Sequence, residues 1–125
     1  MTGAGAVFVG DVGFTLHRDP DTVRGPDVAF VRNRLPQPIP NSYLEFAPDL
    51  VVDVLSDNDR PGEVLAKVGD WLDAGARLVW VVDPERRLAR VYRADGTEHM
   101  LDETDQLLGE DVLPGFSCTL ASILG

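Results

Sequence analysis

The chain has 125 residues, 44% of them hydrophobic, which suits one domain (residues 1–125) with a real core and is too short for two. A formal net charge of −10 repels phosphate backbones, so charge alone disfavours nucleic-acid binding. No apolar run approaches the roughly 20 residues of a membrane span, and residues 1–5 do not begin a signal sequence, so we expect a cytoplasmic location. The lone Cys118 excludes an internal disulfide, and we expect it to be buried or half-buried.

The first third of the chain predicts short strands separated by irregular segments. Residues 6–10 and 13–17 predict either a short hairpin or two strands with a glycine-assisted turn. His17 has no second histidine at ligand spacing, which favours a solvated loop histidine. Residues 25–31 predict a strand that opens with proline and Asp27. Residues 32–42 contain three prolines and cannot form a regular element.

Residues 48–56 predict the central strand of a sheet, covered on both faces, because a nearly continuous aliphatic run belongs to a sheet interior. Asp53 interrupts this run and shares a face with Asp49 and Val51. We interpret Asp49 as an ordinary carboxylate at the strand start. Burying an unpaired carboxylate costs at least several kcal/mol, so Asp53 is paired, neutral or bound to a cation.

Residues 60–74 predict a helix. Residues 57–59 offer capping side chains, Pro61 suits the first turn, and Gly75 can end the helix in a left-handed conformation. The predicted packing face is an apolar stripe of Val64, Val68, Trp71 and Leu72.

Lys67 is the only lysine in the chain, and it lies on the margin of that stripe. Two interpretations stay open from the residues alone. Either the site requires lysine chemistry, or Lys67 forms an exposed ion pair with Glu63 or Asp70, which would contribute only a few tenths of a kcal/mol.

The second half of the chain predicts more sheet. Residues 78–84 predict a buried strand, and strand, helix and strand together predict a parallel crossover. Residues 88–93 predict an antiparallel partner, and a turn at Asp95-Gly96 leads to a short strand over residues 98–101. We predict an acidic loop over 102–111, packing of 112–116 against the fold and a helical turn over 120–124. Four arginines predict a solvated hairpin face: Arg86, Arg87, Arg90 and Arg93.

The chain lacks a glycine-rich phosphate loop, a recognisable nucleophile arrangement and a histidine or cysteine ligand cluster. The remaining candidates for a chemical role are carboxylates. If their strands are neighbours, Asp27 and Asp53 converge with Lys67 at one end of the sheet. Hard oxygen ligands of this kind suit magnesium or manganese.

The order and spacing of these features resemble the restriction endonuclease family of Uma type, in the PD-(D/E)XK nuclease superfamily. The resemblance covers residues 10–124 and includes the Pro26-Asp27 strand, Lys67 with Trp71 four residues on, and the closing residues 113–116. It implies an α/β (α+β) fold, a restriction-endonuclease-like mixed sheet with one main crossover helix. Because members usually carry an N-terminal segment of several dozen residues, we expect this chain to be N-terminally truncated.

The resemblance also implies a function, a metal-dependent endonuclease that hydrolyses phosphodiester bonds of DNA. Asp27, Asp53 and the main-chain carbonyl of Val54 would hold Mg²⁺ or Mn²⁺, and Lys67 would orient or deprotonate water. The suggested partners are DNA and a second copy of the chain, with no membrane. The second acid of the family is usually Glu, and the aromatic residue after the lysine is usually Tyr. The alternative is a degenerate, non-catalytic nuclease-fold interaction module, favoured by the missing segment and the acidic surface.

Overall fold

The computed structural model describes residues 6–9, 14–17, 22–24, 28–31, 48–56 and 59–125. Six strands form the main sheet in the order β1-β4-β5-β6-β7-β8. The β5–β6 pair is parallel and the other neighbours are antiparallel, which confirms the mixed sheet. The strands are β1 (Ala6–Val9), β4 (Val28–Val31), β5 (Leu50–Val54), β6 (Leu78–Asp83), β7 (Leu88–Arg93) and β8 (Glu98–Asp102).

The first strands do not pair with their nearest neighbours in sequence. β1 pairs with β4, whereas β2 (Phe14–His17) pairs with β3 (Thr22–Arg24) in a separate two-stranded sheet. The hairpin alternative for residues 6–17 is therefore wrong. The two strands of the other alternative are confirmed, and its glycine-assisted turn lies outside the described residues. His17 ends β2 and is not a loop residue. The predictions for Asp27 and for residues 32–42 lie outside the described residues.

Helix α1 (Pro61–Asp73) links the parallel strands β5 and β6, so the predicted crossover is confirmed. Gly75 follows the helix with φ of 113°, as the left-handed termination predicts. The prediction of a side-chain cap is wrong for the described residues, because the N-cap is Arg60 and its side chain makes no capping hydrogen bond. Asp59 instead accepts hydrogen bonds from the backbone N–H and the hydroxyl of Ser56.

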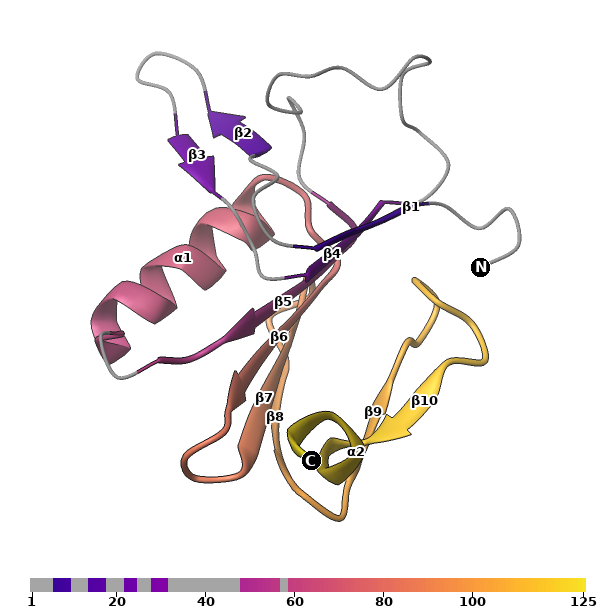
Figure 1. The fold of residues 1–125 in the computed structure, drawn as a ribbon. Coiled ribbons are helices and arrows are strands. Elements are labelled where there is room, and N and C mark those ends of the chain that lie inside the picture. The colour runs from indigo at the N-terminus through magenta and orange to yellow at the C-terminus, as the bar shows by residue number, and fades with distance from the viewer. Residues whose placement is uncertain (1–5, 10–13, 18–21, 25–27, 32–47, 57–58) are drawn as a thin grey trace.

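The sheet separates two apolar clusters, with α1 on one face and the C-terminal elements on the other (Figure 1). On the α1 face, Val68 and Trp71 pack against buried residues of three strands: Ala29, Val51, Val79 and Val81. The predicted stripe is therefore the packing face of α1. The coverage of β5 differs from the prediction, since Leu50 and Val51 are buried but Val54 is 42% exposed. One end of the central strand is therefore open to solvent.

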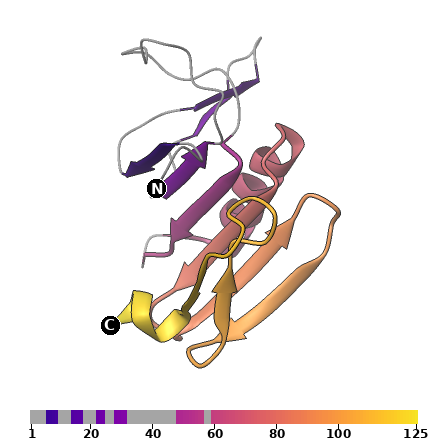
Figure 2. The same ribbon diagram turned by 90° about the vertical axis from the view of Figure 1, so that its right-hand side faces the viewer.

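The C-terminal part covers the second face with β9 (Gln106–Leu108), β10 (Ser117–Thr119) and α2 (Leu120–Leu124), as Figure 2 shows. The prediction of a loop over 102–111 is wrong at β9, which pairs with β10. The prediction that 112–116 packs back is confirmed, because Val112 is buried and the Phe116 ring stacks on Trp80 with 6.1 Å between centroids. No helix in the described part of the chain has the length and apolarity needed to cross a bilayer.

Candidate functional site

The open end of β5 carries two of the predicted site residues. Asp53 is half-buried and shares the α1 face with Val51, as the alternation along the strand predicts. Val28 of β4 lies opposite Val52, and Asp53 lies beside Val81 of β6. Asp53 and Val54 both interact with other groups of the protein, so this carboxylate is not isolated.

Lys67 lies half-buried in the middle of α1. Its positive charge contributes to the lowered pKa of Asp59, whose main cause is the hydrogen bond from the Ser56 backbone N–H, with burial opposing it. The predicted ion pair with Glu63 does not form, since the ion pairs among the described residues all use arginine. The alternative of a pair with Asp70 stays a prediction.

The predicted catalytic set is placed only in part. Asp53 and Val54 lie at the end of β5 and Lys67 lies in the middle of α1, the next helix along the chain, whereas Asp27 lies outside the described residues. Within the described ranges, no group of three or more histidine, cysteine or acidic side chains is arranged to hold a metal ion. The metal ligands therefore stay a prediction.

Asp49 differs from its sequence interpretation because it is only 7% exposed. Its backbone N–H donates to the Phe30 carbonyl at 2.9 Å, and its carbonyl accepts from the N–H groups of Arg77 and Leu78. Asp49 also takes part in further interactions. It is therefore a buried residue that joins the starts of β5 and β6 to β4, and not an ordinary strand-start carboxylate.

A groove of about 690 Å³ opens between α1 and the β6–β7 hairpin, and we call it the β7 groove. Neither Asp53 nor Lys67 lines it. Leu65 does, and at about 100° per residue Leu65 and Lys67 point about 200° apart around α1. The predicted catalytic residues and the β7 groove therefore lie on opposite flanks of this helix. The groove is lined by Leu55, Ser56, Asp59, Pro61, Val64, Leu65, Val81, Asp83, Pro84, Glu85, Arg86, Leu88, Ala89, Arg90 and Tyr92.

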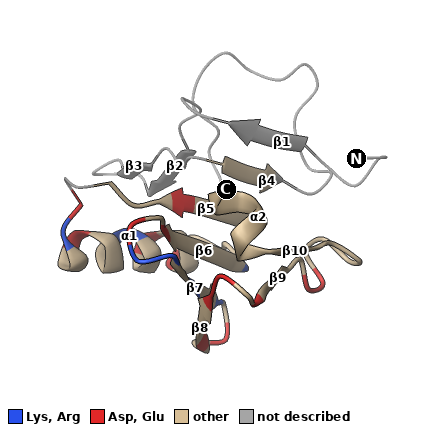
Figure 3. Ribbon diagram, turned by 60° about the horizontal axis from the view of Figure 1, so that its bottom comes forward, with Lys and Arg blue, Asp and Glu red and all other residues tan. Residues whose placement is uncertain are grey.

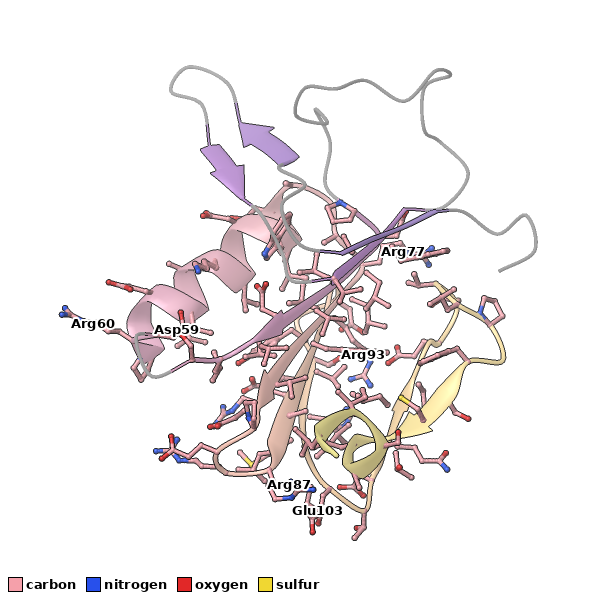
Figure 4. All side chains as sticks on the ribbon, in the orientation of Figure 1. Asp59, Arg60, Arg77, Arg87, Arg93 and Glu103 are labelled. Carbon is pink, nitrogen blue, oxygen red and sulfur yellow. The ribbon has the colours of Figure 1, made fainter. Side chains whose placement is uncertain are left out.

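The prediction of a solvated arginine face is wrong for two of its four members. Arg93 is 24% exposed, and its Nε donates to both carboxylate oxygens of Glu110 at 2.9 Å. Arg87 forms an ion pair with Glu103, and Figure 4 shows both side chains at the end of the β6–β7 hairpin. Arg90 is exposed as predicted.

The surface charge is mixed. Figure 3 shows acidic and basic residues interspersed over α1 and the loops near β7 and β8. The described part of the chain therefore presents no broad basic face for a nucleic-acid duplex.

Sequence reasoning missed the residues of the β7 groove. Leu88, Arg90 and Tyr92 alternate along β7 and therefore share one face, which is a signal that the sequence contains. The sequence did not show that α1 leaves this face accessible. That property depends on where α1 lies across the sheet.

Comparisons with known proteins agree with this architecture. Residues 2–121 match the Uma2 family model, described as "Putative restriction endonuclease". The fold is similar to the crystal structure of "a putative nuclease belonging to DUF820" from Anabaena variabilis, with a TM-score of 0.85 and 20% identity over 98% of this chain and 69% of that one. No curated protein matches the chain. The structural likeness establishes the fold and the family match establishes the kinship, so the chain belongs to the Uma2 family of restriction-endonuclease-like proteins.

Proposed function

We propose that this protein is a metal-dependent nuclease that hydrolyses phosphodiester bonds of DNA, with Asp27, Asp53 and Lys67 as its catalytic residues. The family assignment supports a nuclease, and one structural observation supports the site. Val28 lies opposite Val52 in the antiparallel β4–β5 ladder. One further step along such a ladder would set position 27 opposite position 53, at a Cα separation of about 4.5–5.5 Å.

The proposed donors are of the kind that Mg²⁺ and Mn²⁺ prefer. Asp27 and Asp53 would offer carboxylate oxygens, and Val54 would offer its main-chain carbonyl. The 42% exposure of Val54 leaves room for the waters that magnesium retains. When bound, the ion would supply charge that polarises the phosphate and lowers the pKa of water.

Lys67 would serve the reaction from the α1 side. Lys67 lies in the middle of α1, the element that follows β5 in the chain. From there Lys67 would orient the attacking water by hydrogen bonding and offset the negative charge that develops on the phosphate.

The test compares Asp53→Asn with Asp73→Asn, a matched change at an exposed residue that ends α1. Millimolar Mn²⁺ should raise the melting temperature of the wild-type protein, because a ligand that binds only the folded state stabilises it. Asp53→Asn should abolish this rise and the cleavage of plasmid DNA. Its metal-free stability should stay within about 1 kcal/mol of wild type, since asparagine keeps the size and one oxygen. Asp73→Asn should retain both the Mn²⁺-induced rise in melting temperature and the cleavage of plasmid DNA.

Two outcomes would contradict the proposal. A structural carboxylate at position 53 would make Asp53→Asn roughly 1–3 kcal/mol less stable while the Mn²⁺ response stayed unchanged. Calorimetry that detects no Mn²⁺ binding to the wild-type protein would favour the non-catalytic interaction module.

A further inference from the structure

We propose that the β7 groove binds a short unpaired stretch of a DNA strand, with Arg90 holding a phosphate and Tyr92 contacting a base. The inference rests on the proposed nuclease function, which supplies DNA as the ligand. It adds a second contact surface for that ligand, on the flank of α1 opposite Lys67.

The first support is the state of Arg90. Within the described ranges it forms no ion pair, whereas Arg77, Arg87 and Arg93 each pair with a carboxylate. Its cross-strand neighbours are Val81 and Met100, which cannot neutralise a guanidinium group. The diagonal positions on this face are acidic, Asp83 on β6 and Glu98 and Asp102 on β8, yet none of them forms an ion pair with Arg90. A guanidinium group without an ion pair is suited to an anion, because its planar donors can bind two phosphate oxygens together.

The second support is the face that Arg90 shares. Leu88, Arg90 and Tyr92 follow one another on the groove side of β7, and Tyr92 is half-buried. Proteins that bind single strands combine cations that follow the backbone with aromatic side chains that stack on bases, each base contributing about 1–3 kcal/mol. This strand carries one residue of each kind, two positions apart.

The size of the groove decides between an unpaired strand and a duplex. A volume of about 690 Å³ lies within the range of roughly 300–1,000 Å³ that is typical of small-molecule sites. Such a groove can take a short single-stranded segment, whereas a duplex needs the broad basic face that the described surface lacks.

The acidic residues of the groove limit where a phosphate can bind. Asp83 and Glu85 lie at the hairpin end, and Asp59 lies at the start of α1. Asp83 accepts a hydrogen bond from the Arg86 backbone N–H, and its carboxylate lies 3.8 Å from the Arg86 guanidinium. The same face continues on β8, where Glu98 lies opposite Tyr92 and Asp102 lies opposite Leu88. Among the described residues, Arg90 is the lining cation that forms no ion pair, since Arg86 pairs with Asp83. We therefore place the phosphate at Arg90 and expect salt to weaken binding.

The experiment measures fluorescence anisotropy of a labelled six-nucleotide single strand and of a hairpin duplex of the same sequence, in metal-free buffer with chelator. The variants are Arg90→Gln and a matched control, Arg60→Gln. Arg60 is exposed and does not line the groove, and Figure 4 shows it pointing away from the sheet. Both changes remove one positive charge, so only a specific contact distinguishes them.

We expect the wild-type protein to bind the single strand more tightly than the duplex. Arg90→Gln should weaken this binding about tenfold, consistent with the loss of a charge-assisted pair, and Arg60→Gln should change it less than twofold. Arg90→Lys, which keeps the charge, should restore part of the affinity. Equal losses in Arg60→Gln and Arg90→Gln, or tighter binding of the duplex, would overturn the inference.

The two proposals fail separately, because binding is measured without metal and cleavage with it. If the wild-type protein binds the single strand through Arg90 but cleaves no DNA, the nuclease proposal is rejected and the groove proposal is retained. Cleavage together with unchanged binding in Arg90→Gln would reject the groove and keep the nuclease.

Discussion

Two glycines provide a test of how the fold is packed, because the same change to alanine should have opposite effects at each. Gly69 lies inside α1, and a Cβ there would meet no atom within 4 Å. Gly109 is buried after β9, and a Cβ there would lie 2.2 Å from the Leu113 carbonyl oxygen and 2.6 Å from the Leu113 Cβ. Gly109 does not have a positive φ, so steric overlap is the only strain that alanine introduces.

The magnitudes follow from these contacts. Gly69→Ala removes the entropic penalty of glycine inside a helix and should stabilise the protein by about 0.5–1 kcal/mol. Gly109→Ala forces the turn apart. The turn is held by two hydrogen bonds, which the carbonyl of residue 109 accepts from the N–H groups of Val112 and Leu113. Overpacking of this kind costs about 1–3 kcal/mol, and loss of those bonds adds to it. At about 3–5 °C per kcal/mol for a chain of this size, the two melting temperatures should separate by at least 5 °C.

The assay is thermal unfolding of both variants, followed by circular dichroism and by tryptophan fluorescence. Trp80 stacks on Phe116, which belongs to the turn that Gly109 supports, so its fluorescence should change in Gly109→Ala. A melting temperature for Gly109→Ala equal to or above that of Gly69→Ala would refute the described packing of this turn.

Two further predictions concern titratable groups. Hydrogen bonds from the hydroxyl and backbone N–H of Thr104 lower the pKa of Asp102 below its ordinary 3.8, so its stabilising effect is complete above that pH and is lost as pH falls through the lowered value. The melting temperature of Asp102→Asn should therefore fall less than that of the wild-type protein as the pH drops below about 4. An Asp102→Asn protein whose melting temperature follows the wild-type pH dependence would contradict this assignment. Burial raises the pKa of the Cys118 thiol, against an opposing hydrogen bond with Ser122, so the folded protein should react with a disulfide reagent at pH 8 more slowly than the urea-unfolded chain. Equal rates in the two states would show that the thiol is accessible.

The sequence predicts best where one element is long and strongly periodic. The crossover helix differs from its predicted bounds by one residue at each end, and β6 ends one residue before its predicted bound. The misses are pairings between distant segments. β9 has three residues within an acidic stretch, too few to show an alternation, and its partner β10 comes later in the chain. The pairing of β1 with β4 has the same cause, because two other strands intervene.

The candidate site also has features that are visible in the sequence and features that depend on contacts between distant segments. Asp53 and Lys67 are recognisable in the sequence because each is an exception, a carboxylate within an apolar run and the only lysine of the chain. The four hairpin arginines look alike in the sequence. Arg87 and Arg93 differ from Arg90 only because Glu103 and Glu110 reach them from later loops. That no carboxylate among the described residues forms an ion pair with Arg90 is therefore a property of the fold, and it could not be predicted from the neighbours of Arg90 in sequence.

Under the proposed function, a protein with a net charge of −10 has to bind DNA. The overall electrostatic repulsion between two negatively charged molecules opposes binding, so affinity must come from a few specific contacts. Asp53, Val81 and Arg90 lie in one row across β5, β6 and β7, with the outer two about 10 Å apart, and α1 packs over the middle one. A DNA strand that passes around the start of α1 could therefore contact both flanks of the helix. Under the two proposals, a metal at the open end of β5 and Arg90 in the β7 groove would contribute to affinity independently, and their effects on binding should add.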